Sequence, residues 1–451
     1  AMFFALATLL ITNVVQQSRV VTEQVVSEKA AAIAEAGLQY YKWYLAHFPD
    51  DVTLGATTTG PYAFVYEDSE STAIGEYELA IDAQTYCGEV ASISVESKGH
   101  SYDDPSITRT FAVQYSQPTV AEYAFILNAN VWAGGDRDIS GPYHSNGGIR
   151  MDGTHNSVVT SGQADWTCTS SFGCSPDTTV DGVYTTSGNA TPALFSFPSA
   201  PINFSGLTVD LNAIKVTAQN NGGLYFGPSG DYGYRLTLNG DSTVTVHRVD
   251  GTLEYWGYST ADGWELERHV MSSLSYVGDF TIPASCPVVY VEDKVWLRGD
   301  VDQKVTIAAA DLVNTGVSPS IILRDNLTYS NASSGLLAIA EEDVLIGVNV
   351  PDDMELNGIF IAQNGRYGRN HYDDTYLPSV LDPYVFRNSV ILNGTVVSNG
   401  RVGTQWTSGG TTISGFLNRT NSYDRNLIFD PPAATPRTSD VYRFVDWQEI
   451  R

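Results

Sequence analysis

The chain has 451 residues, and its 51 acidic against 24 basic side chains give a formal net charge of −27. That length allows two or three domains with a sizeable core, and 43% hydrophobic residues exclude a disordered chain. Nucleic acids and anionic lipids are bound by clusters of Lys and Arg, so the acidic charge argues against both as partners. Residues 1–48 carry three basic and three acidic side chains, which places the whole of the −27 on residues 49–451.

Residues 1–48 are predicted to form one long helix. The segment opens AMFFALATLLITNVV, has no charged side chain before Arg19 and no proline before Pro49. Such a helix would be about 70 Å long at 1.5 Å per residue. Apolar and small residues recur at intervals of seven and four, which keeps them on one stripe of a 3.6-residue helix. The stripe is Val14, Val21, Val25, Ala32, Ala36 and Trp43.

Three roles fit this segment. An uncleaved signal peptide has a charged start and a small-residue cleavage site, whereas the apolar run here begins at the first residue. A plain membrane anchor needs roughly 20 apolar residues, and residues 1–15 are shorter than that. The third role is an assembly helix buried among copies of itself, which small residues favour because they let helix backbones approach. These small residues are Ala30, Ala31, Ala32, Ala34, Ala36 and Gly37. The side chains predicted to drive polymerisation are Met2, Phe3, Phe4, Leu6, Leu9, Leu10, Ile11, Val14, Val15, Val21, Val25, Ala32 and Ala36.

Residues 49–117 change from helical to alternating periodicity. Short alternating runs at 62–66, 75–81, 90–95 and 108–115 predict four strands of a small antiparallel sheet. We expect this sheet to cover an aromatic face of the helix made by Tyr40, Tyr41, Trp43, Tyr44 and Phe48.

Residues 118–451 are predicted to form one large β domain. Apolar runs of strand length, punctuated by Gly and Asn and without intervening helices, favour a β-helix or another stacked solenoid, with a β-sandwich as the alternative. Between about 215 and 275 the texture differs, and Asn239-Gly240 between two alternating runs is a hairpin signal. This part is expected to be an antiparallel insertion.

The four cysteines indicate two disulfides in an exported chain, with three connectivities open. The six-residue separation of Cys168 and Cys174 favours a bridge between them, and Cys87 with Cys286 would then remain.

Candidates for chemistry are weak. The acidic pairs could serve glycoside cleavage or bind Ca²⁺, but adjacent acids more often lie on solvated turns. His144, Asp152 and His155, and His371 beside Asp373, lack the spacing of a metal motif. We therefore expect no catalytic or metal residues and no cofactor, with Ca²⁺ as the one ion left open. The acidic pairs are Asp103-Asp104, Asp136 with Asp138, Asp300 with Asp302, Asp352-Asp353 and Asp373-Asp374.

The N-terminal architecture resembles a mature type IV pilin or a related pseudopilin. In that family prepilin peptidase removes a leader before the apolar segment, which then packs in the filament core. A glutamate stands at the fifth mature position of the family, where this chain has Ala5. The stretches AEAGLQYYKWYLAHFPDD (34–51), GPYHSNGGIRMDG (141–153), 288–311 and 358–369, and the terminal VDWQEIR, are similar to large pilin-like surface proteins of uncultivated small-celled bacteria. Those proteins join a pilin-type helix to a right-handed β-helix.

These observations predict an assembly helix (1–48), a small antiparallel domain packed on it (49–117) and a right-handed parallel β-helix with an antiparallel insertion (118–451). The expected function is that of a structural subunit of an extracellular, type IV pilus-like filament, held in the inner membrane before assembly. Its partners would be copies of itself and, transiently, the membrane and the pilus-assembly machinery. The alternatives are an adhesin at the cell surface or filament tip that binds host-cell glycans, and a polysaccharide-degrading β-helix enzyme. Tryptophans that could stack on sugars are Trp132, Trp166, Trp256, Trp264 and Trp406.

Overall fold

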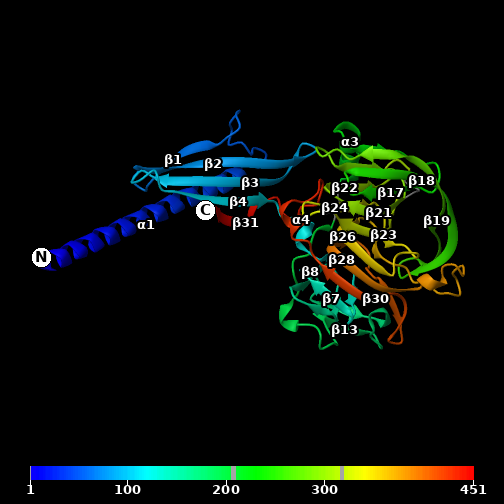
Figure 1. Ribbon diagram of the computed structural model, residues 1–451. Helices are drawn as coiled ribbons and strands as arrows, with labels where there is room; N and C mark the ends of the chain where they lie inside the picture. The colour runs from blue at the N-terminus through cyan, green and yellow to red at the C-terminus, as the bar shows by residue number, and fades with distance from the viewer. Residues whose placement is uncertain (1, 205–209, 315–318, 451) are drawn as a thin grey trace. The chain divides into compact units, whose positions relative to one another are not determined.

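The computed structural model describes residues 2–204, 210–314 and 319–450, with side chains from residue 12 onward (Figure 1). The chain divides into two compact units. Unit 1 comprises Ala1–Gln84, Val90–Gln117 and Ser439–Arg451, and unit 2 comprises Thr85–Glu89 and Pro118–Thr438. The structure therefore differs from the expected boundaries, because the C-terminal residues belong with the N-terminal helix.

Unit 1 is the helix α1 (Met2–His47) packed on an antiparallel sheet. The sheet follows the order β1 (Tyr62–Glu67), β2 (Ala73–Tyr86), β3 (Glu89–Ser101), β4 (Thr108–Ser116) and β31 (Arg443–Ile450). The four predicted strands are confirmed, and each reaches beyond the span predicted for it. The fifth strand, β31, corrects the expectation that residues 118–451 all belong to the large domain. It pairs antiparallel with β4, from Arg443 opposite Ser116 to Ile450 opposite Thr110.

The core of unit 1 lies between α1 and one face of the sheet. Buried residues alternate along β2, β3 and β4 as expected for a sheet with one covered face. The expected aromatic face of the helix is only partly covered, because Tyr41 is buried while Trp43 and Phe48 are 52% and 51% exposed. The core side chains include Ile33, Leu38, Tyr41 and Leu45 from the helix, and Leu79, Ile93, Val95, Phe111, Val113 and Tyr115 from the sheet.

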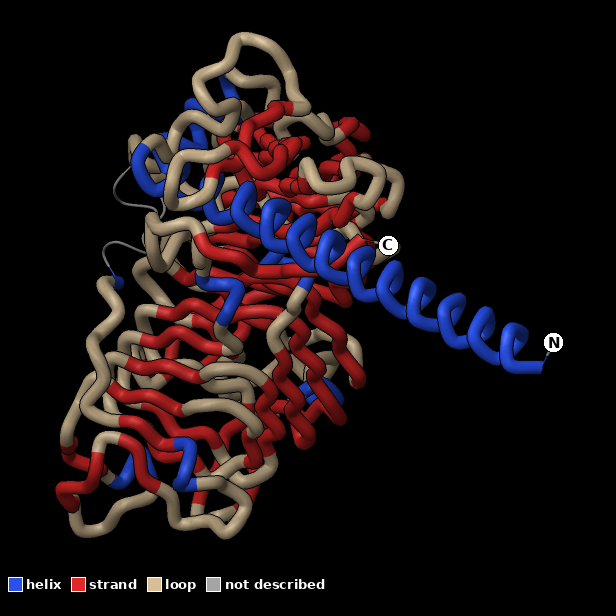
Figure 2. Tube along the Cα trace, turned by 90° about the vertical axis from the view of Figure 1, so that its left-hand side faces the viewer, coloured by secondary structure: helices blue, strands red, loops and turns tan. Residues whose placement is uncertain are grey.

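Most strands of unit 2 pair in parallel with strands distant in the sequence. The main parallel ladder runs through β16 (Leu224–Phe226), β20 (Val288–Val291), β22 (Lys304–Ala309), β24 (Gly335–Ala340), β26 (Asp353–Ala362), β28 (Phe386–Ser398), β5 (Phe125–Leu127), β8 (Tyr143–Ser145), β11 (Val159–Ser161) and β15 (Phe195–Ser196). Figure 2 shows many of these strands lying one beside the next.

Further parallel ladders accompany the main one. A second joins β17 (Tyr234–Asn239), β21 (Val295–Val301), β23 (Ile321–Tyr329), β25 (Val344–Ile346) and β27 (Tyr367–Gly368). A third continues from β28 to β30 (Thr411–Ser422), β7 (Arg137–Ser140) and β10 (Thr154–His155), and a separate set joins β6 (Val131–Ala133), β9 (Ile149–Met151) and β14 (Val183–Tyr184). Two short antiparallel pairings also belong to this unit: β12 (Asp165–Cys168) with β13 (Thr178–Asp181), and β29 (Gln405–Ser408) with β30.

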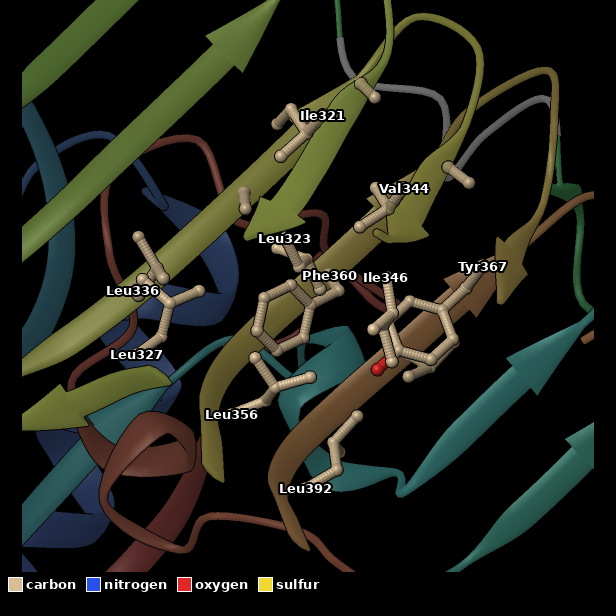
Figure 3. Close-up of a cluster of buried hydrophobic side chains, with 14 of the residues drawn as sticks. Ile321, Leu323, Leu327, Leu336, Val344, Ile346, Leu356, Phe360, Tyr367 and Leu392 are labelled. Atoms are coloured by element: carbon tan, nitrogen blue, oxygen red, sulfur yellow. The ribbon is translucent and has the colours of Figure 1, made fainter. Parts of the chain in front are cut away.

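The main core of unit 2 is aliphatic and lies between these ladders. Figure 3 shows part of it, where Phe360 of β26 lies near Leu323 of β23 and Ile346 of β25. The labelled side chains, which come from six strands, are all 3% exposed or less. Side chains from different ladders therefore bury one another.

The chain enters the main ladder of unit 2 in the middle and not at an end. The Val120 N–H donates to the Pro436 carbonyl at 3.0 Å, and the Thr438 N–H donates to the Pro118 carbonyl at 2.8 Å, so entry and exit are adjacent. The first strand of the ladder in sequence, β5, pairs with β28, which precedes the exit. The two ends of the ladder, β15 and β16, follow one another in sequence.

The antiparallel insertion is present with different limits. Strands β17, β18 (Thr243–Ser259) and β19 (Gly263–Thr281) pair antiparallel, and the hairpin predicted at Asn239-Gly240 is confirmed by the pairing of Leu238 with Val244. The insertion thus spans 234–281 and not about 215–275. The helix α3 (Leu211–Asn220), packed on β16 and β20, corrects the expectation of a domain without helices, as does the short α4 (Asn426–Phe429).

Candidate assembly interface

The helix α1 has two apolar faces, and the sheet of unit 1 covers only one of them. The covered face consists of Val26, Ala30, Ile33, Ala34, Leu38, Tyr41 and Leu45, each 4% exposed or less. At 100° per residue this face is centred about 165° from the predicted stripe of Val14, Val21, Val25, Ala32, Ala36 and Trp43. The stripe therefore points away from the sheet.

Exposure of the stripe is high in the described part of the helix. Val14, Val21 and Val25 are 63%, 60% and 47% exposed, and Trp43 is 52% exposed. Ala32 is exposed and Ala36 half-buried. Every residue from 12 to 25 is exposed, which includes Val15 at 48%. In Figure 1 this part of α1 extends beyond the sheet of unit 1. The remaining predicted side chains, those of Met2, Phe3, Phe4, Leu6, Leu9, Leu10 and Ile11, lie outside the described residues.

Small residues of α1 serve packing within the subunit. A Cβ added to Gly99 of β3 would lie 2.4 Å from the Ala34 nitrogen and 2.6 Å from the Ala30 carbonyl oxygen, so helix and strand backbones nearly touch. A Cβ on Gly37 would lie 2.5 Å from Ser97 Oγ. The expectation that all these small residues serve contacts between subunits is therefore corrected for Ala30, Ala34 and Gly37.

Buried hydroxyl groups fix the C-terminal half of α1. Tyr115 Oη donates to the Leu38 carbonyl at 2.6 Å, and Tyr41 Oη donates to the Val52 carbonyl at 2.9 Å. Burial raises the pKa of both phenols well above the usual value, so both remain donors at any physiological pH. These two hydrogen bonds tie this half of the helix to the sheet and to the segment that follows the helix.

Within residues 2–204, 210–314 and 319–450, no helix combines the length and the apolarity needed to cross a bilayer.

Both predicted disulfides are confirmed. Cys168 is bonded to Cys174 across a loop of six residues, and Cys87 to Cys286 across a separation of 199. Cys87 lies in the turn between β2 and β3, where its φ of 55° and the φ of 87° at Gly88 form a tight turn. This turn belongs to unit 2. Its Cys87 is held in the disulfide with Cys286.

The acidic pairs have structural partners. Burial opposes ionisation of Asp136, but the Arg419 guanidinium, at 2.6 and 2.8 Å, outweighs it and holds the pKa of Asp136 below its usual range. Other members accept hydrogen bonds or ion pairs as follows: Asp103 from Lys29, Asp104 from Ser106, Asp138 from Thr154, Asp300 from Thr328, Asp302 from Ser242, Asp352 from Arg387, Asp353 from Ser389 and Asp373 from Thr375. Each of these carboxylates therefore has a partner within the subunit.

The histidines considered for a metal site contact different partners. His144 contacts Thr160 Oγ1 at 2.8 Å and Asn146 Oδ1 at 3.0 Å, while His155 contacts the Ser157 carbonyl at 3.0 Å. His371 contacts Ser414 Oγ, and Asp152 accepts from Trp132 and Arg150. Among the described residues no group of three or more His, Cys, Asp or Glu side chains is placed to hold a metal ion. The described residues therefore include no such group of ligands for the Ca²⁺ ion that the sequence left open.

The tryptophans considered for sugar stacking occupy different settings. Trp166 is buried, and Trp132 lies 4.1 Å beneath the Arg150 guanidinium. Trp256 and Trp264 are 45% and 40% exposed on the β18–β19 hairpin, and Trp264 shares a cluster with Trp406. Sequence reasoning missed the partners Tyr258, His371 and Tyr376, since only the fold brings β18 beside residues 371–376. The available signal in the sequence was the alternation of apolar and charged residues at the start of WELERH (264–269), which indicates a strand that carries Trp264.

No protein-family model matches the chain, and no curated protein matches it. Among solved structures, the competence-associated pilin ComZ from Thermus thermophilus is similar over 94% of this chain and 98% of that one, at 13% identity and a TM-score of 0.30. A TM-score this low does not establish a shared fold.

Proposed function

We propose that the protein is a structural subunit of an extracellular type IV pilus-like filament and polymerises through α1. One observation carries this proposal. The helix already covers its own sheet with one face, and yet it presents a second apolar stripe, Val14 to Trp43, to solvent. Long apolar faces left open on a folded subunit mark surfaces for association.

Assembly through α1 would explain why the net charge lies in residues 49–451 and not in the helix. Three Lys or Arg and three Glu cancel within residues 1–48, so helices can pack without net repulsion. The charge of −27 resides in the remainder, which would face solvent and keep filaments soluble and separate. A contact repeated by one rotation and one rise gives an open filament.

The proposed location is outside the cell, where the two disulfides persist. Before assembly the apolar residues 1–15 would be held in the inner membrane and handed to the assembly machinery. The role proposed is structural and not catalytic.

We interpret the ladders of unit 2 as a right-handed parallel β-helix. Support comes from the order β5, β6, β7, β8, β9, β10, in which every third strand returns to the same ladder: β8 pairs with β5, β9 with β6 and β10 with β7. Parallel crossover connections are right-handed in nearly all proteins. Such a head stacks its core from turn to turn and would hold a stable surface away from the filament core.

Truncation tests the assembly function. Residues 12–25 contribute nothing to the buried core of unit 1 in the described structure, so a chain starting at Val26 should fold. We expect the full-length protein, on removal of detergent, to form particles that sediment and appear as filaments in negative stain, and the truncated chain to remain monomeric. Monomers from both chains, or equal assembly by both, would contradict the proposal.

A further inference from the structure

An aromatic cluster is partly open to solvent on the outside of unit 2. Trp264 of β19 is 40% exposed and its ring lies 4.6 Å from that of Tyr376, which is 51% exposed. The Trp264 ring also lies 5.6 Å from Tyr258 and 5.7 Å from His371, with Trp406 behind them, 5.6 Å from Tyr258 and 5.8 Å from His371. The exposed rings thus rest on a packed aromatic base.

Hydrogen bonds hold this base in place. Tyr258 and His371 exchange backbone hydrogen bonds of 3.0 and 2.9 Å. The Trp406 indole N–H donates to the Arg369 carbonyl at 2.9 Å, and His371 Nδ1 lies 2.8 Å from Ser414 Oγ. The rings are therefore preorganised, and a ligand that stacked on them would order little of the protein.

A polar pocket of about 290 Å³ opens next to the cluster along the chain. Glu265 and Leu266, which follow Trp264, line it, and so does Asn370, which precedes His371. Its most buried lining residues include Glu267, His269, Arg366 and Asn370, each 9% exposed or less. Pocket and cluster therefore take neighbouring residues from strand β19 and from the segment that contains Asn370 and His371.

Glu267 lines the pocket and is the centre of a hydrogen-bond network. Its carboxylate accepts from Asn370 Nδ2 at 2.5 Å and from Tyr372 Oη at 3.0 Å, and it lies 3.1 Å from His269 Nδ1. Burial opposes ionisation, but these three partners outweigh it and lower the pKa of Glu267, so the group is a carboxylate. Arg366 Nη2 donates to Asn370 Oδ1 and extends the network.

Arg366 has one donor without a partner among the described residues. The residue is 7% exposed, lines the pocket, and its Nε has no hydrogen-bond partner within the described residues. A buried N–H without an acceptor costs free energy of the order of 1–3 kcal/mol unless a ligand or water accepts it. An acceptor in the pocket, from a ligand or from water, would remove this cost.

The pocket carries side chains of both charges. Four acids, Asp262, Glu265, Glu267 and Asp343, line it together with Arg268, Lys294, Arg366 and the imidazole of His269. A ligand with net charge would meet like as well as opposite charges, and a polyanion would in addition be repelled by an acidic protein. Neutral hydroxyl groups, which both donate and accept, suit carboxylate, amide and guanidinium partners together.

We propose that this pocket and the aromatic cluster form a binding site for a neutral oligosaccharide. The apolar C–H face of one sugar ring stacks on Trp264 and Tyr376, and the hydroxyls of the adjoining ring enter the pocket and bond to Glu267, Asn370 and Arg366. The site binds and does not cleave. It goes beyond the filament function and does not depend on it, because every residue involved belongs to unit 2.

The test uses the full-length protein, as detergent-held monomers and as any assembled particles, in titration calorimetry. The probes are cellohexaose, xylohexaose, maltohexaose, mannohexaose and chitohexaose, with oligogalacturonate and oligoalginate as anionic comparisons. We expect at least one neutral hexasaccharide to bind. Trp264→Ala should weaken binding at least tenfold, while Trp264→Phe should stay within about threefold of the original affinity because a stacking ring remains. Loss of filaments with binding intact would separate this proposal from the filament function.

Tyr276→Ala is the matched control, since Tyr276 is 62% exposed on the same strand β19 but takes no part in the cluster or the pocket. Its binding should be unchanged. If Trp264→Ala fails to fold in a thermal melt, Tyr376→Ala takes its place. The proposal is overturned if no neutral probe binds, if only the anionic probes bind, if binding survives the alanine variants, or if the bound probe is hydrolysed.

Discussion

Val21→Asp is the sharpest test of the exposed stripe. Val21 is 60% exposed in the subunit, so the substitution should change the free energy of unfolding by less than about 0.5 kcal/mol. In a filament core the same position loses roughly 1–2 kcal/mol of valine burial, and an unpaired buried carboxylate adds several kcal/mol. A total of about 4 kcal/mol per subunit corresponds to roughly a thousandfold rise in the critical concentration for assembly.

The assay is sedimentation over a range of protein concentrations, paired with thermal unfolding of each variant. Val158→Asp is the matched control, because Val158 is 46% exposed in unit 2 and receives the same charge. It should assemble like the original chain. The reasoning fails if Val21→Asp assembles with a critical concentration within threefold of the original while its melting temperature is unchanged, or if both aspartates abolish assembly equally.

Three further predictions concern stability. Gly99→Ala places a methyl group 2.4 Å from the Ala34 backbone nitrogen, so overpacking should lower the stability of unit 1 by about 1–3 kcal/mol in thermal melts, and an unchanged melt would refute the close packing. Replacing Cys168 and Cys174 by serine should cost about 2 kcal/mol in urea unfolding by loop-closure entropy, and peptide mapping should find the bridge in the native chain. Burial raises the pKa of Asp424, so its ionised form lowers the stability of the fold at neutral pH. Protonation removes that cost as the pH falls through the raised pKa. The Asp424→Asn variant should therefore gain less stability between pH 7 and pH 4 than the original chain does.

Local patterns in the sequence identified elements well. The apolar start and the absence of proline predicted α1, alternating residues predicted the strands of the small sheet, and Asn239-Gly240 predicted a hairpin. These features depend on side-chain periodicity and turn chemistry, which neighbouring residues define. The stripe through Val21 also followed from spacing alone, and its exposure agrees with a separate face.

The pairing of strands that lie far apart in the chain could not be predicted from the sequence. The terminal VDWQEIR was assigned to the large domain, because nothing local indicates that β31 pairs with β4, more than 300 residues earlier. The place of β5 beside β28 is likewise set by packing between ladders. The pocket around Glu267 could not be predicted either, since Asn370 and Tyr372 reach it only through the fold.

The most direct test of the filament account is a helical reconstruction of the assembled full-length protein by electron cryo-microscopy. The account predicts that α1 forms the filament core and that Val14, Val21, Val25 and Trp43, exposed in the single subunit, are buried against helices of neighbouring subunits. Filaments held together through unit 2, with this stripe still facing solvent, would contradict it.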